Sequence, residues 1–227
     1  MKKFRLLALG LLAALTLTGC ATAAPGKIKN SAGLFDGRTL DGWVQIPPAS
    51  WTVTNGAMAS LGVARGVIYT ANDYSRYRLT FTMRHISGNK DHQPCFLIFC
   101  QRPAAGEKPL DALGGIQFQV PNGGHWDYRS GHNNGGGKEF SSVTKTKFDN
   151  QQWSQVEILV DAAKGIARMA VAQPPGSPAV EVLDFNDPAA GRPGPIAWQM
   201  HNKGLFDEYK DVNIEVDPKD DRLLTVK

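Results

Sequence analysis

Near the C-terminal end of the chain, apolar and polar residues alternate one by one, and this pattern restricts the possible folds more than any other feature. In residues 196–201 the alternation separates Ile196, Trp198 and Met200 from Ala197, Gln199 and His201. Successive side chains of a β-strand point to opposite faces, so the segment predicts a strand with one core face and one polar face. A second strand is expected after a short loop, with Val212, Ile214 and Val216 as its apolar set.

Short segments that alternate, or that are apolar throughout, recur along the rest of the chain. They are residues 51–54 and 57–59 on either side of the turn pair Asn55-Gly56, and residues 66–70, 77–84, 95–100, 116–120, 156–160, 166–171 and 179–183. No segment shows convincing helical periodicity. Many short strands separated by turn residues predict an all-β sandwich or barrel. Because no repeat or linker interrupts residues 33–217, we expect one domain there, followed by a C-terminal tail over residues 218–227.

The N-terminus has the features of a secretory signal. Three basic residues, Lys2, Lys3 and Arg5, precede an apolar run over residues 6–17 that is too short to span a membrane. The sequence Leu-Thr-Gly-Cys that ends at Cys20 resembles a bacterial lipobox. We therefore expect removal of residues 1–19 and lipidation of Cys20, with an ordinary cleaved signal as the alternative.

The leader also defines the expected location and charge of the mature protein. Ala21 follows the cysteine, which resembles outer-membrane sorting in a Gram-negative cell, so we expect an extracytoplasmic protein anchored at the outer membrane and facing the periplasm. Residues 20–32 predict a flexible tether. Loss of the leader takes three positive charges from a formal net charge of +4 and leaves +1. This balance predicts no nucleic-acid partner, and membrane contact through the lipid alone.

Two cysteines remain after Cys20 is assigned to the lipid. Cys95 and Cys100 are five residues apart in one predicted strand, which places them about 16 Å apart on opposite faces if the strand is straight. A disulfide needs Cα atoms within about 7 Å. We therefore predict that the two thiols are not bonded to each other and serve as small buried apolar side chains.

Both ends of the predicted domain resemble one family. Residues 33–43 read GLFDGRTLDGW, and residues 194–216 read GPIAWQMHNKGLFDEYKDVNIEV. In this order and spacing they resemble the opening and closing signatures of the 3-keto-disaccharide hydrolase domain family. The resemblance implies a concanavalin A-like jelly-roll β-sandwich with two antiparallel sheets. It also implies a role in the extracytoplasmic breakdown of glycosides oxidised at C3, with an oxidised saccharide as the substrate.

Polar side chains on three predicted strands could contact such a sugar. Gln117 and Gln119 share one strand face, and Gln199 and His201 share another. The arginines and threonines of residues 78–84 form a third set, for which a solvated outer face is the favoured reading. The resemblance selects Gln119, Gln199 and His201 as site residues. At position 117 many relatives carry Glu, so this chain lacks that carboxylate.

A glycine-rich segment over residues 121–137 follows the strand with the two glutamines. A loop of this length is entropically expensive unless it acts, so we expect it to contribute to the site. Trp126 or Tyr128 could stack on a sugar. His125, Asp127 and His132 could hold a divalent metal, although their spacing matches no established metal motif. No cofactor is therefore certain, and a divalent metal is the one candidate.

Three further residues are weaker candidates. Glu208 is expected in the loop before the last strand, together with Asp207, and could act as a second acid or base. Lys210 in the same loop and Arg65 before the strand at 66–70 could contact ligand oxygen atoms. For this charged loop, a solvated turn is the favoured alternative.

These residues favour one chemistry over several others. The sequence contains no Gly-x-Ser-x-Gly elbow and no phosphate-binding glycine loop, and Glu157 and Asp161 do not form the carboxylate pair of ordinary glycoside hydrolysis. A ketone at C3 acidifies the C2 proton, so a single base such as His201 could start a β-elimination. The alternatives are a non-catalytic, lipid-anchored carbohydrate-binding module and a surface lipoprotein with merely solvated glutamines.

Overall fold

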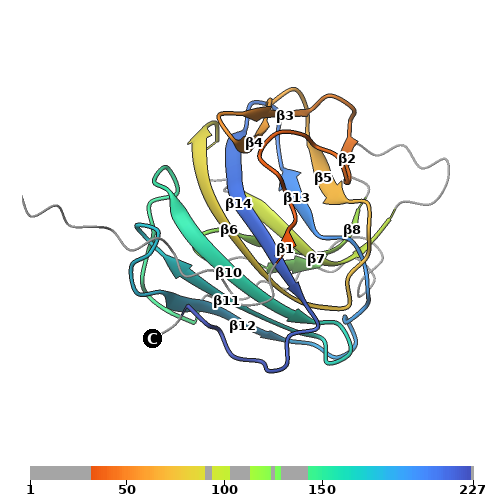
Figure 1. The fold of residues 1–227 in the computed structure, drawn as a ribbon, viewed down its shortest axis with the longest axis vertical. Helices are drawn as coiled ribbons and strands as arrows, with labels where there is room; N and C mark the ends of the chain where they lie inside the picture. The colour runs from red at the N-terminus through yellow and green to blue at the C-terminus, as the bar shows by residue number, and fades with distance from the viewer. Residues whose placement is uncertain (1–31, 90–93, 103–112, 124–125, 129–142, 226–227) are drawn as a thin grey trace, which may run out of the picture.

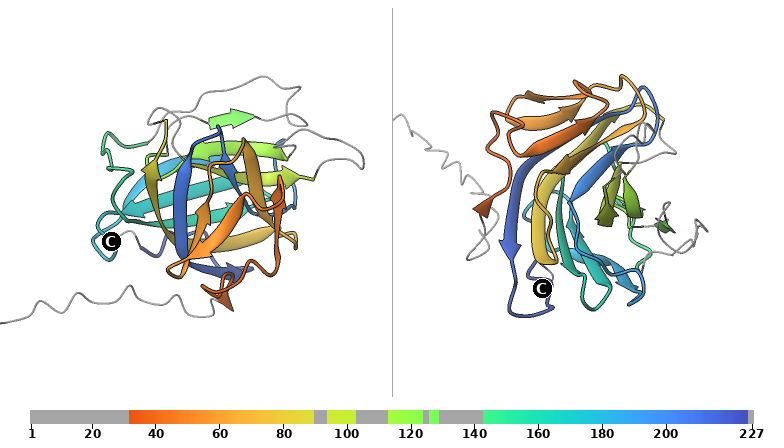
Figure 2. Two further views of the ribbon diagram at one scale, coloured as in Figure 1. Left: turned by 90° about the horizontal axis from the view of Figure 1, so that it is seen from above. Right: turned by 90° about the vertical axis from the view of Figure 1, so that its right-hand side faces the viewer.

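We describe the fold from a computed structural model, which describes residues 32–89, 94–102, 113–123, 126–128 and 143–225. In these ranges the chain forms β-strands joined by turns and contains no helix. Consequently, the described ranges offer no helix with the length and apolarity to cross a membrane. The strands pair in two antiparallel sheets that pack face to face (Figures 1 and 2). This confirms the predicted all-β sandwich.

The larger sheet, which we call sheet A, has eight strands. Their order is β12 (Val180–Asn186), β11 (Ile166–Ala172), β10 (Ser154–Asp161), β6 (Arg76–Ser87), β14 (Phe206–Val216), β4 (Ala57–Ser60) and β3 (Trp51–Thr54), with β1 (Ala32–Gly33) paired to β14. The tight turn between β3 and β4 is the predicted Asn-Gly hairpin. Asn55 and Gly56 both have positive φ, at 49° and 76°, as a type I′ turn requires.

The smaller sheet, sheet B, has six strands. Their order is β2 (Trp43–Ile46), β5 (Gly66–Thr70), β13 (Ala197–Met200), β7 (Cys95–Gln101), β8 (Gly114–Gln119) and β9 (Trp126–Tyr128). The strand with the alternation of Trp198 and Met200 against Ala197 and Gln199, β13, is therefore central, with β5 on one side and β7 on the other. The right-hand view of Figure 2 shows sheets A and B as separate layers.

Aromatic side chains fill the space between the sheets. Trp198 of β13 lies at the centre and is fully buried. The centroid of its ring system lies 5.0 Å from the ring of Tyr209, 5.3 Å from Trp43, 5.4 Å from Phe81 and 5.5 Å from Phe96. Aromatic pairs at these separations contribute about 0.5–1.5 kcal/mol each beyond their buried area. The alternation in β13 thus faces Trp198 and Met200 to the core, as predicted, and Gln199 to the outer face of sheet B.

The two cysteines of β7 are buried and are not joined by a disulfide, which confirms that prediction. Their expected placement on opposite faces is wrong. A register shift lies between Ile98 and Gln101, and Phe99 has a positive φ of 51°. This irregularity turns Phe99 into the main core, so Cys100 returns to the outer face, where it packs with Leu97.

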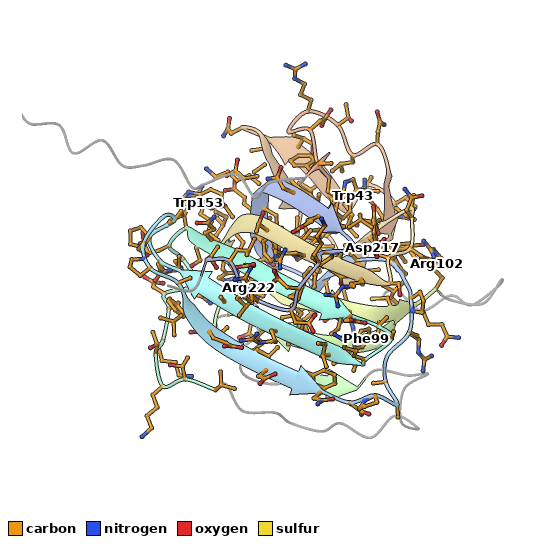
Figure 3. All side chains as sticks on the ribbon, turned by 60° about the horizontal axis from the view of Figure 1, so that its bottom comes forward. Trp43, Phe99, Arg102, Trp153, Asp217 and Arg222 are labelled. Carbon is orange, nitrogen blue, oxygen red and sulfur yellow. The ribbon has the colours of Figure 1, made fainter. Side chains whose placement is uncertain are left out.

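The segment predicted as a C-terminal tail packs on the outer face of sheet A (Figure 3, where Arg222 lies over this face). Beneath it, Arg78 and Glu157 are only 3% and 0% exposed and form an ion pair. Glu157 accepts hydrogen bonds from the backbone N–H groups of Leu224 and Thr225 at 2.9 and 2.8 Å. The expectation that the arginine and threonine face of residues 78–84 is solvated is therefore wrong at Arg78, because the C-terminal segment covers it.

We expect acid to weaken this attachment. The hydrogen bond from Arg222 lowers the pKa of Asp220 to about 2, and Lys164, followed by Arg76, lowers that of Asp221. Both carboxyls have lower pKa values folded than unfolded, so their contribution to stability is present above about pH 4 and lost toward pH 2. Melting temperatures between pH 6 and pH 2 should fall less steeply for the Asp220→Asn, Asp221→Asn double variant than for the wild type. Parallel curves would contradict this expectation.

Candidate functional site

One row of side chains crosses the outer face of sheet B at the end where β13 finishes. In the strand register, Gln199 of β13 lies opposite Cys95 of β7, and Cys95 lies opposite Gln119 of β8. Directly opposed residues in an antiparallel pair have Cβ atoms about 4.5–5.5 Å apart. Gln119 and Gln199 therefore stand on either side of one small thiol side chain. The structure brings these two predicted ligand-binding residues to the same face and the same row.

His201 lies just beyond this row, where β13 has ended. Met200, the last residue of β13, pairs with Gly66, the first residue of β5. His201 and Arg65 therefore continue these two strands beyond the same end of sheet B. His201 is partly exposed and Arg65 is exposed. The loop after His201 is hydrogen-bonded to the loop before Arg65, because the N–H of Gly204 donates to the carbonyl of Gly62 at 2.8 Å.

Most of the rest of this face is apolar and buried, although Val44 of β2 is 37% exposed. Its other members form a second, smaller cluster beside the main core, made of Val67, Tyr69, Leu97, Cys100, Leu113 and Ala197. Gln117, which pairs with Leu97, and Gln199 are both buried, whereas Gln119 and His201 are partly exposed. A polar ligand would therefore meet the protein at the edge formed by Gln119, His201 and Arg65. We call this set, together with Gln199, the glutamine–histidine edge.

The close approach of β2 and β5 at this edge requires a glycine. A Cβ atom at Gly66 would lie 2.2 Å from the carbonyl oxygen of Ile46, so Gly66→Ala must push the two strands apart. We expect a loss of about 1–3 kcal/mol in unfolding free energy from this overpacking, measured by denaturant titration. The matched control is Gly33→Ala, where the nearest atom lies at 3.9 Å and we expect a change within about 0.5 kcal/mol. Equal effects of both changes would contradict the argument.

Glu208 and Lys210 do not join the glutamine–histidine edge. The predicted loop at this position is wrong, because residues 206–216 form β14 of sheet A. Tyr209 points into the core, so both charged neighbours point to the outer face of sheet A, on the opposite side of the sandwich from Gln199. There Glu208 pairs with Arg84 at 2.8 Å, and the Lys210 amine lies 4.2 Å from the centroid of the Trp153 ring, which Figure 3 labels on this sheet.

The structure reveals a buried ionisable pair that the sequence does not predict. Asp207, expected in a solvated turn, lies in β14 opposite His85 of β6, and its Oδ1 atom is 2.7 Å from His85 Nδ1. Burial raises the pKa of the Asp207 carboxyl, and the hydrogen bond with His85 opposes this rise. The signal for this pair in the sequence was weak. His85 continues the core-facing alternation of Tyr77 to Met83, but its partner is distant in the chain.

The remaining candidates belong to the segment around β9. His125 and His132 lie outside the described residues. The backbone of residues 126–128 forms β9 and pairs with β8, and the side chains of Trp126, Asp127 and Tyr128 are not described. Across the described ranges, no three His, Cys, Asp or Glu residues lie together as a metal site would require. The divalent metal therefore stays a prediction.

The fold can now be compared with solved structures. The carbohydrate binding module CBM66 from Bacillus subtilis superposes with a TM-score of 0.55 at 12% identity, over 77% of this chain and 95% of that chain. The exoplasmic/lumenal domain of VIP36 in its Ca²⁺/Man-bound form gives 0.56 at 10% identity, over 87% of this chain and 94% of that chain. At such low identity the likeness shows the fold alone, which is the concanavalin A-like jelly roll of carbohydrate-binding modules and lectins.

The sequence comparison is more specific. The family model described as the 3-keto-alpha-glucoside-1,2-lyase-like domain matches residues 31–215. The match covers most of the chain and includes every residue of the glutamine–histidine edge, so the chain belongs to this family. No curated protein sequence matches the chain.

Proposed function

We propose that this protein is an extracytoplasmic, lipid-anchored enzyme that cleaves 3-keto-glycosides, including 3-keto-disaccharides, at the glutamine–histidine edge. One observation carries the proposal. Gln119 and Gln199 come from strands that are distant in sequence and share one row on the outer face of sheet B, and His201 follows the end of β13 in a chain of the 3-keto-alpha-glucoside-1,2-lyase-like family. Lipidation at Cys20 and the periplasmic location are part of the proposal and rest on the sequence of the leader.

The chemistry needs one base and a polar pocket. The C3 ketone acidifies the proton on C2, and the imidazole of His201 takes this proton. The electron pair left on C2 forms the C1–C2 double bond, and the bond from C1 to the glycosidic oxygen breaks. The departing oxygen takes up a proton, which the imidazolium can supply. Water can then add across the double bond, so that the net result is hydrolysis.

The other residues of the edge suit the binding of the sugar. The partly exposed amide of Gln119 can donate to and accept from sugar hydroxyls, and the buried amide of Gln199 lies in the same row; both lie one strand away from Cys95. The guanidinium of Arg65 presents donors only, and it suits an oxygen that gains negative charge, such as that of the enolate. Because Gln117 is an amide, the mechanism assigns it no proton transfer.

The experiment compares a 3-keto-disaccharide with its unoxidised parent. The full chain, produced with its own leader and purified in mild detergent, is incubated with each sugar with and without a chelator, and products are identified by mass spectrometry. We expect cleavage of the keto sugar only. A product lighter by one water than the hydrolysed sugar indicates elimination without hydration. Loss of cleavage on chelation would add a divalent metal to the site.

A non-catalytic carbohydrate-binding module is the second candidate. Gln117 favours it, because an amide stands at the position where the family resemblance leads us to expect a carboxylate. The similarity of the fold to CBM66 and to VIP36 is also consistent with binding alone. If neither sugar is cleaved but one binds in calorimetry, this candidate replaces the enzyme.

A further inference from the structure

An ionisable pair occupies one end of the core between β6 and β14. His85 and Asp207 are 2% and 1% exposed, and their side chains are hydrogen-bonded at 2.7 Å. Met83 and Tyr209, two residues further along the same strands, belong to the apolar core. Apolar residues of similar size often give equal or greater stability than a buried ionisable pair. Stability alone is therefore a weak reason for this pair.

The backbone of Asp207 is tied to the loop that begins at His201. The N–H of Asp207 donates to the hydroxyl oxygen of Ser60 at 2.8 Å, and the same hydroxyl donates to the carbonyl of Leu205 at 3.0 Å. Ser60, the last residue of β4, therefore bridges the end of the loop and the start of β14. Its side chain is buried, so water cannot easily replace either hydrogen bond.

The loop after His201 also packs closely against the residues that follow β6. A Cβ atom at Gly88, just after β6, would lie 2.6 Å from the carbonyl oxygen of Gly204 and 2.8 Å from a methyl carbon of Leu205. Gly204 also donates to the carbonyl of Gly62, three residues before Arg65. The ends of β4 and β6 therefore hold the segment that runs from His201 to Asp207.

We propose that His85, Asp207 and Ser60 form a positioning unit for His201. The hydrogen bond of Asp207 with His85 holds the start of β14 against β6. Ser60, which is hydrogen-bonded to both Asp207 and Leu205, fixes Leu205 relative to Asp207, and Leu205 lies four residues after His201. None of the three touches the substrate in the proposed mechanism. The inference rests on the proposed function for the catalytic role of His201, but the placement of the His201 ring can be measured without any reaction.

The test uses three variants and one matched control. Asp207→Ala removes the partner of His85, Asp207→Asn keeps an acceptor for His85, and Ser60→Ala removes only the bridging hydroxyl. The control is Asp161→Asn, which disrupts the ion pair of Asp161 with Arg76 at the opposite end of β6. For each variant we would measure kcat and KM with the keto sugar, and the NMR signal and titration of the His201 ring, assigned with His201→Gln.

We expect Asp207→Ala to lower kcat by about 10- to 100-fold and to change KM by less than about threefold, because a small misplacement of a reacting group costs this much. Asp207→Asn should recover most of the lost rate, Ser60→Ala should fall between them, and the control should match the wild type. The His201 signal should shift in Asp207→Ala and in Ser60→Ala but not in Asp161→Asn.

Two results would overturn the inference. One is a wild-type kcat and an unchanged His201 signal in folded Asp207→Ala and Ser60→Ala. The other is the same loss in the control. If Asp207→Ala does not fold, the kcat and the His201 signal of Ser60→Ala alone test the inference by the same criteria. If the wild type cleaves no sugar, a shifted His201 signal in the variants still supports the positioning unit, and only the proposed enzymatic function fails.

Discussion

His201→Ala is expected to lower the rate of 3-keto-disaccharide cleavage by about 10²–10⁴-fold, the usual contribution of a general base. His201 lies at the end of β13 beside the row of Gln199, Cys95 and Gln119, and it is the only residue of this edge with a side chain that can accept a proton near neutral pH. Alanine removes the imidazole but leaves both glutamines in place. We therefore expect kcat to fall much more than KM rises, measured by initial rates on the keto sugar.

The control for this prediction comes from the opposite side of the sandwich. Glu208→Gln and Lys210→Ala change charged residues near His201 in sequence, but their side chains lie on the outer face of sheet A. We expect both variants to retain wild-type rates. Full activity in His201→Ala would show that the base lies elsewhere. A large loss in Glu208→Gln would contradict the assignment of the site to sheet B.

The fold is predictable from the sequence where apolar and polar residues alternate clearly. Residues 77–84 and 196–201 alternate cleanly, and the structure places their apolar sets in the core of the sandwich. The register irregularity in β7 could not be foreseen, because residues 95–100 are apolar throughout and carry no period that a shift would interrupt. The extra core-facing residue, Phe99, is visible only once β8 is paired beside it.

The candidate site was predictable only where its residues lie in strands. Gln119 and Gln199 are predicted on strand faces, and the pairing of β13, β7 and β8 places them in one row, whereas His201 is predicted within a strand and lies just after β13. Glu208 and Lys210 are expected in the charged loop that precedes the apolar set of Val212, Ile214 and Val216. In the structure the same charges alternate with Asp207 and Tyr209, which face the core. A buried aspartate carries no local signal, since its partner His85 is more than a hundred residues away.

The C-terminal segment is the other feature that local patterns could not show, and removing it has the second large expected effect. A chain that ends at Asp217 loses Leu223 from its apolar contact with sheet A and loses the hydrogen bonds to Glu157. Burial of a leucine contributes about 1.5–3 kcal/mol, and each hydrogen bond to a charged group about 1.5–3 kcal/mol. Part of this gain is offset by the entropy of ordering the segment. We expect the truncated chain to have a lower free energy of unfolding than the full chain, seen as a lower denaturation midpoint.

Two adjacent leucines give this prediction a matched pair of point variants. Leu223 is 8% exposed and packs in the cluster with Leu159 and Ala170, whereas Leu224 is 44% exposed. Leu223→Ala should cost at least about 2 kcal/mol, as at other buried sites, and Leu224→Ala should stay within about 0.5 kcal/mol. Because the family model ends at residue 215, equal stability of the truncated and full chains would mean that the family domain is complete without this cover. The expected loss would instead make residues 218–225 part of the folded domain, since they shield the ion pair of Arg78 and Glu157 from water.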